Sequence, residues 1–285
     1  MQPIKKKMPL LTKSVSGYRA LTDKEREQKN ADSYNSKTGD LDKYDGYDCP
    51  ICKNKGWIAD IQYSFGYWSE VHKPCKCQKI RQTIRRLQRS GLKNIVKEYT
   101  FDKFEALEEW QVAIKKAAIR FCEDDGNNTF FIGGQSGAGK THICTAIAVK
   151  YIKKGKEVRY MLWRDEIDRI KAAVNDGEAY DALMREIKEA DVLYIDDLFK
   201  DGYEDGRYKV PSAADVKRAF EIINYRYINP HLVTIISSER TLYELNEIDE
   251  AIAGRIAERA KAAGYCLNLK RDKSRNYRMK GMGEI

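Results

Sequence analysis

Two hydrophobic periods alternate along the chain from about residue 99 to its C-terminus. Short apolar runs of strand length are followed by longer stretches in which apolar residues recur every three or four positions, as on one face of a helix. This alternation predicts an α/β fold with a five-stranded parallel sheet covered by helices on both faces. The strands are expected at residues 129–132, 157–162, 192–196, 232–237 and 265–269, and the helices at 141–153, 164–174, 180–190, 213–226 and 249–262.

The first third of the chain has a different pattern. Residues 1–45 are polar and rich in lysine, and we expect them to be largely loose, apart from one short helix that opens at Thr22 with Glu25 in capping-box spacing. Apolar residues return at helical spacing in 78–89, and a Ser-Gly pair ends this helix. We place a domain boundary near residue 95, with one domain at 1–95 and the other at 96–285. The helix before it carries Arg81, Arg85, Arg86 and Arg89.

Charge and cysteine content narrow the classes of function. The formal net charge of +9 makes polyanions candidate partners, since lysine and arginine displace counterions from phosphates. The sequence has no run of about 18 apolar residues and no recognisable secretory signal, so we expect a cytoplasmic protein with no membrane partner. Seven cysteines, an odd number, argue against a disulfide framework and favour metal ligands or buried thiols.

A glycine-rich stretch lies between the first expected strand of the sheet and the helix that follows it. It matches the pattern G-x-x-x-x-G-K-[ST], in which inward-facing backbone N–H groups and a helix N-terminus hold phosphates. We therefore expect it to bind ATP, with Lys140 on the β- and γ-phosphates and the Thr141 hydroxyl on Mg²⁺. A chance glycine-rich turn is the alternative, and it leaves the flanking strand and helix unexplained. The loop residues are Gly134, Gln135, Ser136, Gly137, Ala138, Gly139, Lys140 and Thr141.

An acidic pair completes the expected magnesium site. Asp196 and Asp197 follow the apolar run of the third strand, and P-loop proteins hold Mg²⁺ with an acidic residue at such a strand end. Asp196 is predicted to contact the metal through water, and Asp197 to polarise the attacking water. A strand that merely ends in a turn with two aspartates is the alternative, and the upstream loop disfavours it.

Two more groups are candidates for the site. The fourth strand ends in Ser237-Ser238-Glu239, so the Ser238 hydroxyl is expected beside the γ-phosphate. Arg255 and Arg259 lie one helical turn apart on one face. Either could reach a neighbouring subunit's nucleotide as an arginine finger, which predicts self-association through this domain. A charged helix face exposed to solvent is the alternative reading.

Four cysteines form two close pairs in the N-terminal region. Cys49 and Cys52 form a C-x-x-C pair, and Cys75 and Cys77 a C-x-C pair, with a loop expected between them. Four thiolates on two tight turns can meet tetrahedrally, as at a closed structural zinc site. His72 could replace one cysteine. A redox C-x-x-C motif is less consistent, because no βαβ unit is predicted around residue 49. The remaining cysteines are expected to be core thiols.

Several of these segments together resemble the AAA+ bacterial and phage replicative helicase loaders of the DnaC/DnaI type. They are the loop form Gly-Ala-Gly-Lys-Thr-His142, the Ile-Asp-Asp strand end, the helix Phe220-Glu-Ile-Ile-Asn-Tyr-Arg226-Tyr and the fourth strand. The transposase helper IstB shares much of this core. The resemblance runs from about residue 99 to the C-terminus, and the cysteine-bearing region resembles a zinc-containing N-terminal domain of some loaders.

The resemblance implies a partner and a substrate. Residues 1–95 would bind the hexameric replicative DNA helicase, the ATPase domain would bind single-stranded DNA, and His142 would join the nucleotide-binding residues. Ser237-Ser238-Glu239 departs from the common Thr-Ser-Asn ending, so Glu239 stands at a sensor asparagine position and hydrolysis is expected to be slow. Little chain remains after the fifth strand, so no helical lid is expected. Arg226 is a third candidate for action in trans.

The expected function is therefore an ATP-switched loader that delivers a ring helicase onto single-stranded DNA. A transposase helper of the IstB type is one alternative, which the cysteine pairs disfavour. Another is a zinc-ribbon nucleic-acid-binding module with a nucleotide-dependent oligomerisation domain. A small-molecule kinase is a fourth, but no substrate-binding insertion is evident. The arginine-rich helix is consistent with binding to DNA, to an acidic partner, or to solvent alone.

Overall fold

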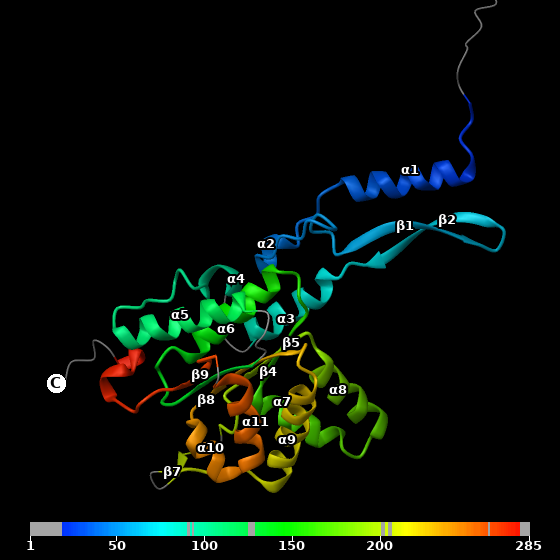
Figure 1. Cartoon of the computed structure of the whole chain (residues 1–285). Helices are drawn as coiled ribbons and strands as arrows, with labels where there is room; N and C mark the ends of the chain where they lie inside the picture. The colour runs from blue at the N-terminus through cyan, green and yellow to red at the C-terminus, as the bar shows by residue number, and fades with distance from the viewer. Residues whose placement is uncertain are drawn as a thin grey trace, which may run out of the picture.

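The computed structural model describes residues 19–89, 92, 94–124, 129–200, 203–204, 207–261 and 263–279. Its centre is a parallel five-stranded sheet with strand order β4-β5-β8-β3-β9 (Figure 1). Parallel neighbours require crossover connections, and here helices make them. All five predicted strands are confirmed. Their bounds are β3 Thr129–Gly133, β4 Val158–Leu162, β5 Val192–Asp196, β8 Val233–Ser238 and β9 Cys266–Asn268.

Helices pack on both faces of this sheet, and each face has its own apolar core. Successive side chains of a strand point to opposite faces, so Phe130 and Ile132 join one core while Phe131 joins the other. One face is covered by α3 Cys77–Arg89, α4 Ile95–Glu98, α5 Glu109–Glu123 and α6 Lys140–Lys153. The opposite face is covered by α7 Trp163–Ala173, α8 Gly177–Glu189, α9 Ala213–Ile228, α10 Leu242–Ile248 and α11 Glu250–Ala260.

Three segments differ from the sequence-based expectation. Helix α5 was not predicted. The helix expected at 249–262 is observed as α11, and α10 precedes it as a separate helix capped by Thr241. The loop expected between the cysteine pairs is an antiparallel hairpin, β1 Trp57–Ser64 and β2 Tyr67–Pro74. Its turn places Phe65 and Gly66 at positive φ, the conformation that tight two-residue hairpin turns require.

The N-terminal region extends away from the sheet (Figure 1). Helix α1 Asp23–Ser36 lies along the hairpin, and α2 Asp42–Asp45 follows it. The predicted capping box is present, since the Thr22 hydroxyl accepts from the Glu25 N–H and the Glu25 carboxylate accepts from the Thr22 N–H. Residues 1–18 of the segment expected to be loose lie outside the described residues, and from Asp23 onward much of it is helical.

Helix α3 joins the N-terminal region to the sheet. Its apolar residues Ile80, Ile84 and Leu87 belong to the same buried core as strand β3. On another side, Arg81 makes two hydrogen bonds to the carboxylate of Asp45, at 2.5 and 2.6 Å, with both side chains buried. The boundary near residue 95 stays a prediction, although α3, which it assigns to the N-terminal domain, packs against the sheet.

The remaining described elements are short. The two-residue strands β6 Tyr203–Glu204 and β7 Arg207–Tyr208 pair after β5, and two 3₁₀ turns, η1 Lys273–Arg275 and η2 Tyr277–Met279, follow β9. No helix in the described part of the chain is both long enough and apolar enough to cross a membrane.

The Arg81–Asp45 pair leads to a stability prediction. Replacing Asp45 by Ala leaves a buried guanidinium without its carboxylate, which costs about 3 kcal/mol of unfolding free energy. A urea titration followed by circular dichroism should show this loss. The exposed Asp40 lies nearby and provides the control, because Asp40→Ala should change the midpoint little. Equal stability of the two variants would contradict the role given to this pair.

Candidate nucleotide-binding site and cysteine cluster

The glycine-rich loop connects the end of β3 to the start of α6, as predicted. Gly134 has a φ of 132°, and a Cβ atom there would lie 2.7 Å from the Leu269 carbonyl oxygen. Gly139 precedes the helix at a φ of 79°, in the left-handed region that favours glycine. Both positions therefore need glycine, one for close approach and one for backbone conformation.

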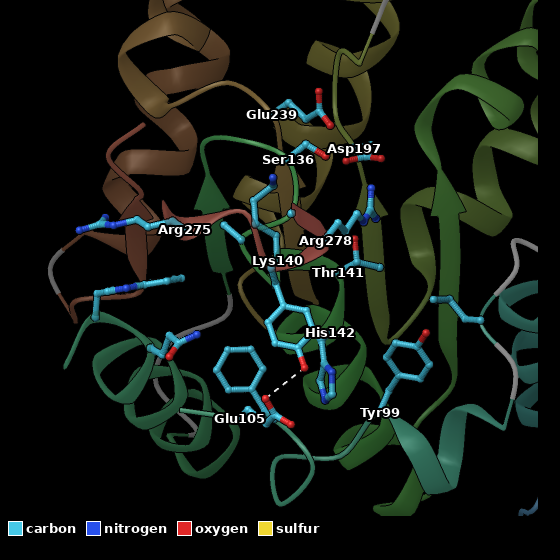
Figure 2. Close-up of a pocket in the computed structure, with 18 of the residues that line it drawn as sticks. Tyr99, Glu105, Ser136, Lys140, Thr141, His142, Asp197, Glu239, Arg275 and Arg278 are labelled. Carbon is cyan, nitrogen blue, oxygen red and sulfur yellow. Dashed lines mark hydrogen bonds between the residues drawn. The ribbon is translucent and has the colours of Figure 1, made fainter. Parts of the chain in front are cut away.

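The loop borders a cleft of about 370 Å³, shown in Figure 2. Apolar and aromatic side chains from the segment before α5 line one end, and charged side chains from the strand ends line the other. Ser136, Gly137, Ala138, Gly139, Lys140, Thr141, His142 and Asp197 are the predicted residues that line it. Glu239, which the sequence places at a sensor position, lines it too, as do residues that were not predicted, among them Tyr99, Phe104, Glu105, Trp110, Lys200, Arg275, Tyr277 and Arg278.

Lys140 extends along the loop toward the charged end of the cleft. Figure 2 shows its side chain pointing to the region where Ser136, Asp197 and Glu239 gather. Its ammonium donates to the carbonyl oxygens of Gly134 and Gln135, at 2.8 and 2.7 Å. Burial lowers the pKa of Lys140, while nearby Asp197 and Glu239 oppose this shift. A cation so placed matches the role of the P-loop lysine on terminal phosphates.

Asp196 ends strand β5 and is buried. Its two carboxylate oxygens accept from neutral hydroxyls: Ser237 at 2.5 Å and Tyr160 at 3.0 Å. Burial raises the pKa of Asp196, as does neighbouring Asp197. Carboxylate and hydroxyl oxygens are the ligands that Mg²⁺ prefers, so Asp196 and the Thr141 hydroxyl fit the predicted metal site chemically.

Asp197 lies beside Asp196 and faces the cleft. Its φ of 58° turns the chain sharply at the end of the strand, and its N–H donates to the Ser237 hydroxyl oxygen at 3.0 Å. The carboxylate pairs with Lys200 at 2.8 Å, and Lys200 also pairs with Glu239 at 3.0 Å. The strand ends thus present a charged group of three to the cleft, of which sequence reasoning named Asp197 and Glu239 but missed Lys200.

Two predicted contacts take other roles in the structure. The Ser238 hydroxyl is buried, donates to the Leu198 carbonyl at 2.8 Å and accepts from the Arg240 N–H, so Glu239 rather than Ser238 faces the cleft. The Gln135 side chain makes two hydrogen bonds to the backbone of Asp272, at 2.6 and 2.7 Å. Gln135 therefore fastens the segment after β9 to the loop.

The segment after β9 forms part of the site, although the sequence did not predict this. The Tyr277 N–H donates to the Gly137 carbonyl at 2.9 Å, and the Tyr277 hydroxyl donates to Glu105 at 3.1 Å (Figure 2). Arg275 lies over the Trp110 ring, 5.1 Å from its centroid. Two short 3₁₀ turns follow the fifth strand among the described residues, and their side chains cover part of the cleft. A basic, aromatic stretch after the last strand was the signal available in the sequence.

His142 lies at the aromatic end of the cleft. Its Nε2 is 3.1 Å from the Thr100 carbonyl oxygen, and the rings of Tyr99 and Phe104 lie 5.2 and 5.4 Å from its own. Burial lowers the pKa of His142, so its neutral form is favoured. The aromatic residues and His142 form a partly apolar wall of the kind that accommodates a nucleobase.

The three candidate arginines lie outside this cleft. Arg226 is 2% exposed and donates to the Thr234 hydroxyl and to backbone carbonyls of Lys188 and Ala190, which argues against it among the three candidates for action across a subunit interface. Arg255 bonds Asn224, and Arg259 bonds the Tyr227 carbonyl. These two are only partly buried on α11, where a second chain could approach them.

The four paired cysteines converge. All four Sγ atoms of Cys49, Cys52, Cys75 and Cys77 lie within 4.8 Å of one another, and all four residues are buried. Burial raises the pKa of the Cys75 and Cys77 thiols, so a bound cation is what would stabilise their thiolates. His72 instead bonds Glu70 at 2.8 Å. The donor set fits a closed tetrahedral site.

Removal of the loop lysine gives a direct binding prediction. Lys140→Ala should weaken ATP binding by about tenfold or more, because a charge-assisted contact contributes about 1.5–3 kcal/mol. Isothermal titration calorimetry would measure it. Lys150→Ala, at an exposed position on the same helix, is the matched control. Equal ATP affinity of Lys140→Ala and the parent chain would rule out the phosphate role of this loop.

The cysteine cluster predicts a bound metal ion. Purified chain should contain about one zinc per molecule by elemental analysis, as a four-thiolate site requires. Cys77→Ser should lose most of that zinc, whereas Cys122→Ser, which changes a buried thiol outside the cluster, should keep it. A zinc content well below one per chain in the unmodified protein would reject the site.

Comparison with known proteins supports the assignment of a nucleotide-binding site. The family model for IstB-like ATP binding proteins matches residues 70–280. The protein XkdC of the phage-like element PBSX of Bacillus subtilis is 30% identical over 240 residues, which are 78% of this chain and 85% of that protein.

Similarity to replication proteins is partial. The replicative helicase loader DnaC of Escherichia coli K12 is 30% identical over 117 residues, 40% of this chain and 48% of that loader, so the match spans about half of it. The crystal structure of DnaI has a TM-score of 0.50 at 20% identity, covering 63% of this chain and 94% of that one, which shows a common fold. Since the family model spans most of the sequence, the chain belongs to the family of IstB-like ATP-binding proteins.

Proposed function

We propose that this chain is an ATP-dependent loader that binds a hexameric replicative DNA helicase and delivers it onto single-stranded DNA. The observation that carries the proposal is the cleft, in which the phosphate loop, Lys140 and the acidic end of β5 meet. The membership of the chain in an ATP-binding family and its partial identity with a helicase loader support the same function.

In the proposed reaction, ATP is hydrolysed with Mg²⁺. The Thr141 hydroxyl and Asp196 would hold the metal, which supplies charge neutralisation to the transferring phosphoryl group. Asp197 would orient the attacking water. Because Asp197 is paired with Lys200 in this structure, we expect turnover to be slow and to rise when DNA or the helicase binds.

The N-terminal region is the proposed helicase-binding part. Zinc in the cysteine cluster would hold together two turns and the first residue of α3, Cys77. The hairpin between the cysteine pairs exposes aromatic side chains, with Phe65 97% exposed at its tip. Exposed aromatic residues are enriched at protein interfaces, which supports a protein partner for this region.

Single-stranded DNA and a second copy of the chain are the other proposed partners. The formal charge of +9 supports DNA binding. On α3, however, Arg81 is buried and Arg86 pairs with Glu186, so Arg85 and Arg89 are the arginines that the helix presents to solvent. In the assembled form, Arg255 or Arg259 would act on a neighbouring subunit's nucleotide. The proposed activity places the protein in the cytoplasm.

A transposase helper of the IstB type is the second candidate, since the family model carries that resemblance. The observation against it is the four-cysteine cluster ahead of the ATP-binding core. A zinc-ribbon nucleic-acid-binding module with an oligomerisation domain remains the third candidate. It would show nucleotide binding without turnover.

The decisive experiment uses the full chain and a purified hexameric replicative helicase from the same host. Gel filtration with light scattering should show a complex of the two whose amount differs between ATP and ADP, because the cleft couples nucleotide state to partner binding. Lys140→Ala should abolish that difference. In a second arm, the complex should transfer helicase onto circular single-stranded DNA.

No complex under any nucleotide condition would contradict the loader proposal. Retention of a transposase in place of the helicase, when both are offered, would favour the second candidate. Undetectable ATP turnover with DNA and helicase both present would favour the third.

A further inference from the structure

Arg81 lies beside the cysteine cluster as well as between the N-terminal region and the sheet. It is 2% exposed and follows Cys77 by one turn of α3, so the two side chains share a face of the helix. The guanidinium is within hydrogen-bonding reach of the Cys77 side chain, and the centroid of the Tyr47 ring lies 5.5 Å from the guanidinium carbon. A buried cationic donor therefore faces one of the four candidate metal ligands.

The two terminal nitrogens of this guanidinium have partners. Nη1 donates to both oxygens of the Asp45 carboxylate, and Nη2 donates to the Asn54 side-chain oxygen at 3.0 Å. The third nitrogen, Nε, is buried and has no hydrogen-bond partner among the described residues. A buried donor without an acceptor costs free energy. The Nε–H therefore needs a stronger acceptor than a neutral thiol, whose sulfur accepts hydrogen bonds only weakly.

The same guanidinium is tied to the other cysteine pair. Its partner Asn54 lies in the turn after Cys52, and the Asn54 side-chain oxygen also accepts from the Cys49 N–H at 2.7 Å. A second sulfur of the cluster already receives a hydrogen bond, because the Gly56 N–H donates to the Cys52 Sγ at 3.2 Å. Arg81 is thus fixed against the first cysteine pair through Asn54 and lies beside the second pair directly.

Arg81 can contribute to the cluster as a directed donor. Asp45 is 7% exposed and neutralises the charge of the guanidinium at close range, so little net charge is left to act on the cysteines. Four thiolates around a divalent cation carry excess negative charge, and hydrogen bonds to such ligands orient them and tune the metal. A metal-bound thiolate, unlike a thiol, is a charged acceptor of hydrogen bonds.

We propose that Arg81 is a positioning residue of the metal site, in which its Nε–H donates to the Cys77 thiolate while Asp45 and Asn54 hold the guanidinium in place. The inference rests on the metal site proposed for the four cysteines and goes beyond it, because it assigns metal retention in part to a residue outside the ligand set. Since Asp45 ends α2 and Cys77 begins α3, metal binding and the packing of α2 on α3 are coupled.

The test compares zinc affinity in the full chain and its variants, by competition with a chelator of known affinity. Arg81→Met should weaken zinc binding by about tenfold or more, as loss of a residue that orients a metal ligand does. Arg81→Lys keeps a charge for Asp45 but lacks the guanidinium fork, so it should weaken zinc binding too. Arg85→Met, at an exposed position on the same helix, is the matched control and should keep the parent affinity.

A double variant separates this role from support of the fold. Arg81→Met alone leaves the Asp45 carboxylate buried and unpaired, which destabilises the fold. Adding Asp45→Asn removes that charge and keeps an acceptor for the Tyr47 N–H, so the unfolding midpoint should recover toward the parent value. Zinc affinity should stay low in the double variant, because Cys77 still lacks its donor.

Cobalt(II) in place of zinc reports on the sulfur ligands themselves. A hydrogen bond stabilises the thiolate lone pair, so its loss in Arg81→Met should move the sulfur-to-cobalt charge-transfer band to lower energy.

Parent zinc affinity or an unmoved band in Arg81→Met would overturn the inference and leave the metal site standing. Recovery of zinc affinity together with stability in the double variant would overturn it as well, since Arg81 would then support only the fold. A parent chain that binds no zinc would reject the metal site, and the inference with it.

Discussion

The parallel arrangement of the five strands is the constraint on which the site depends. In a parallel sheet every strand ends at the same edge, so the residues that follow β3, β5 and β8 are brought together although they are far apart in sequence. Lys140, Asp197 and Glu239 share one cleft for this reason. Both faces of the sheet are buried, so the strands are apolar along their length and their polar groups lie at the strand ends.

The acidic side chains that meet at this edge of the sheet repel one another, and the structure offsets the repulsion by pairing them with hydrogen-bond donors or a cation. Asp196 is held by two hydroxyls and Asp197 by Lys200. Lys200 lies three residues after Asp197, so one short stretch of chain supplies both members of this ion pair. The same ammonium also pairs with Glu239, which follows the neighbouring strand β8, so a single side chain joins two strand ends.

The cysteine cluster and the sheet are linked through one helix. Cys77 is both a member of the cluster and the first residue of α3, whose apolar residues lie in the core against the sheet. Thr83 on that helix also donates to the Val158 carbonyl of β4. A metal ion bound to the four thiols would thus be attached to the nucleotide-binding domain through a continuous, packed helix, while α1 and the hairpin extend outward from it (Figure 1).

The sequence by itself determined what is local. Hydrophobic periods set the five strands, closely spaced glycines set the phosphate loop, and close spacing set the two cysteine pairs, because each of these depends on neighbours along the chain. Only the tertiary structure decided which side chains at and beyond the strand ends face the cleft and which are buried. It buried Arg226 and Ser238, turned Glu239 to the cleft, and laid Arg275 and Tyr277 beside a loop more than a hundred residues away. Such contacts depend on packing between distant segments, which no local pattern encodes.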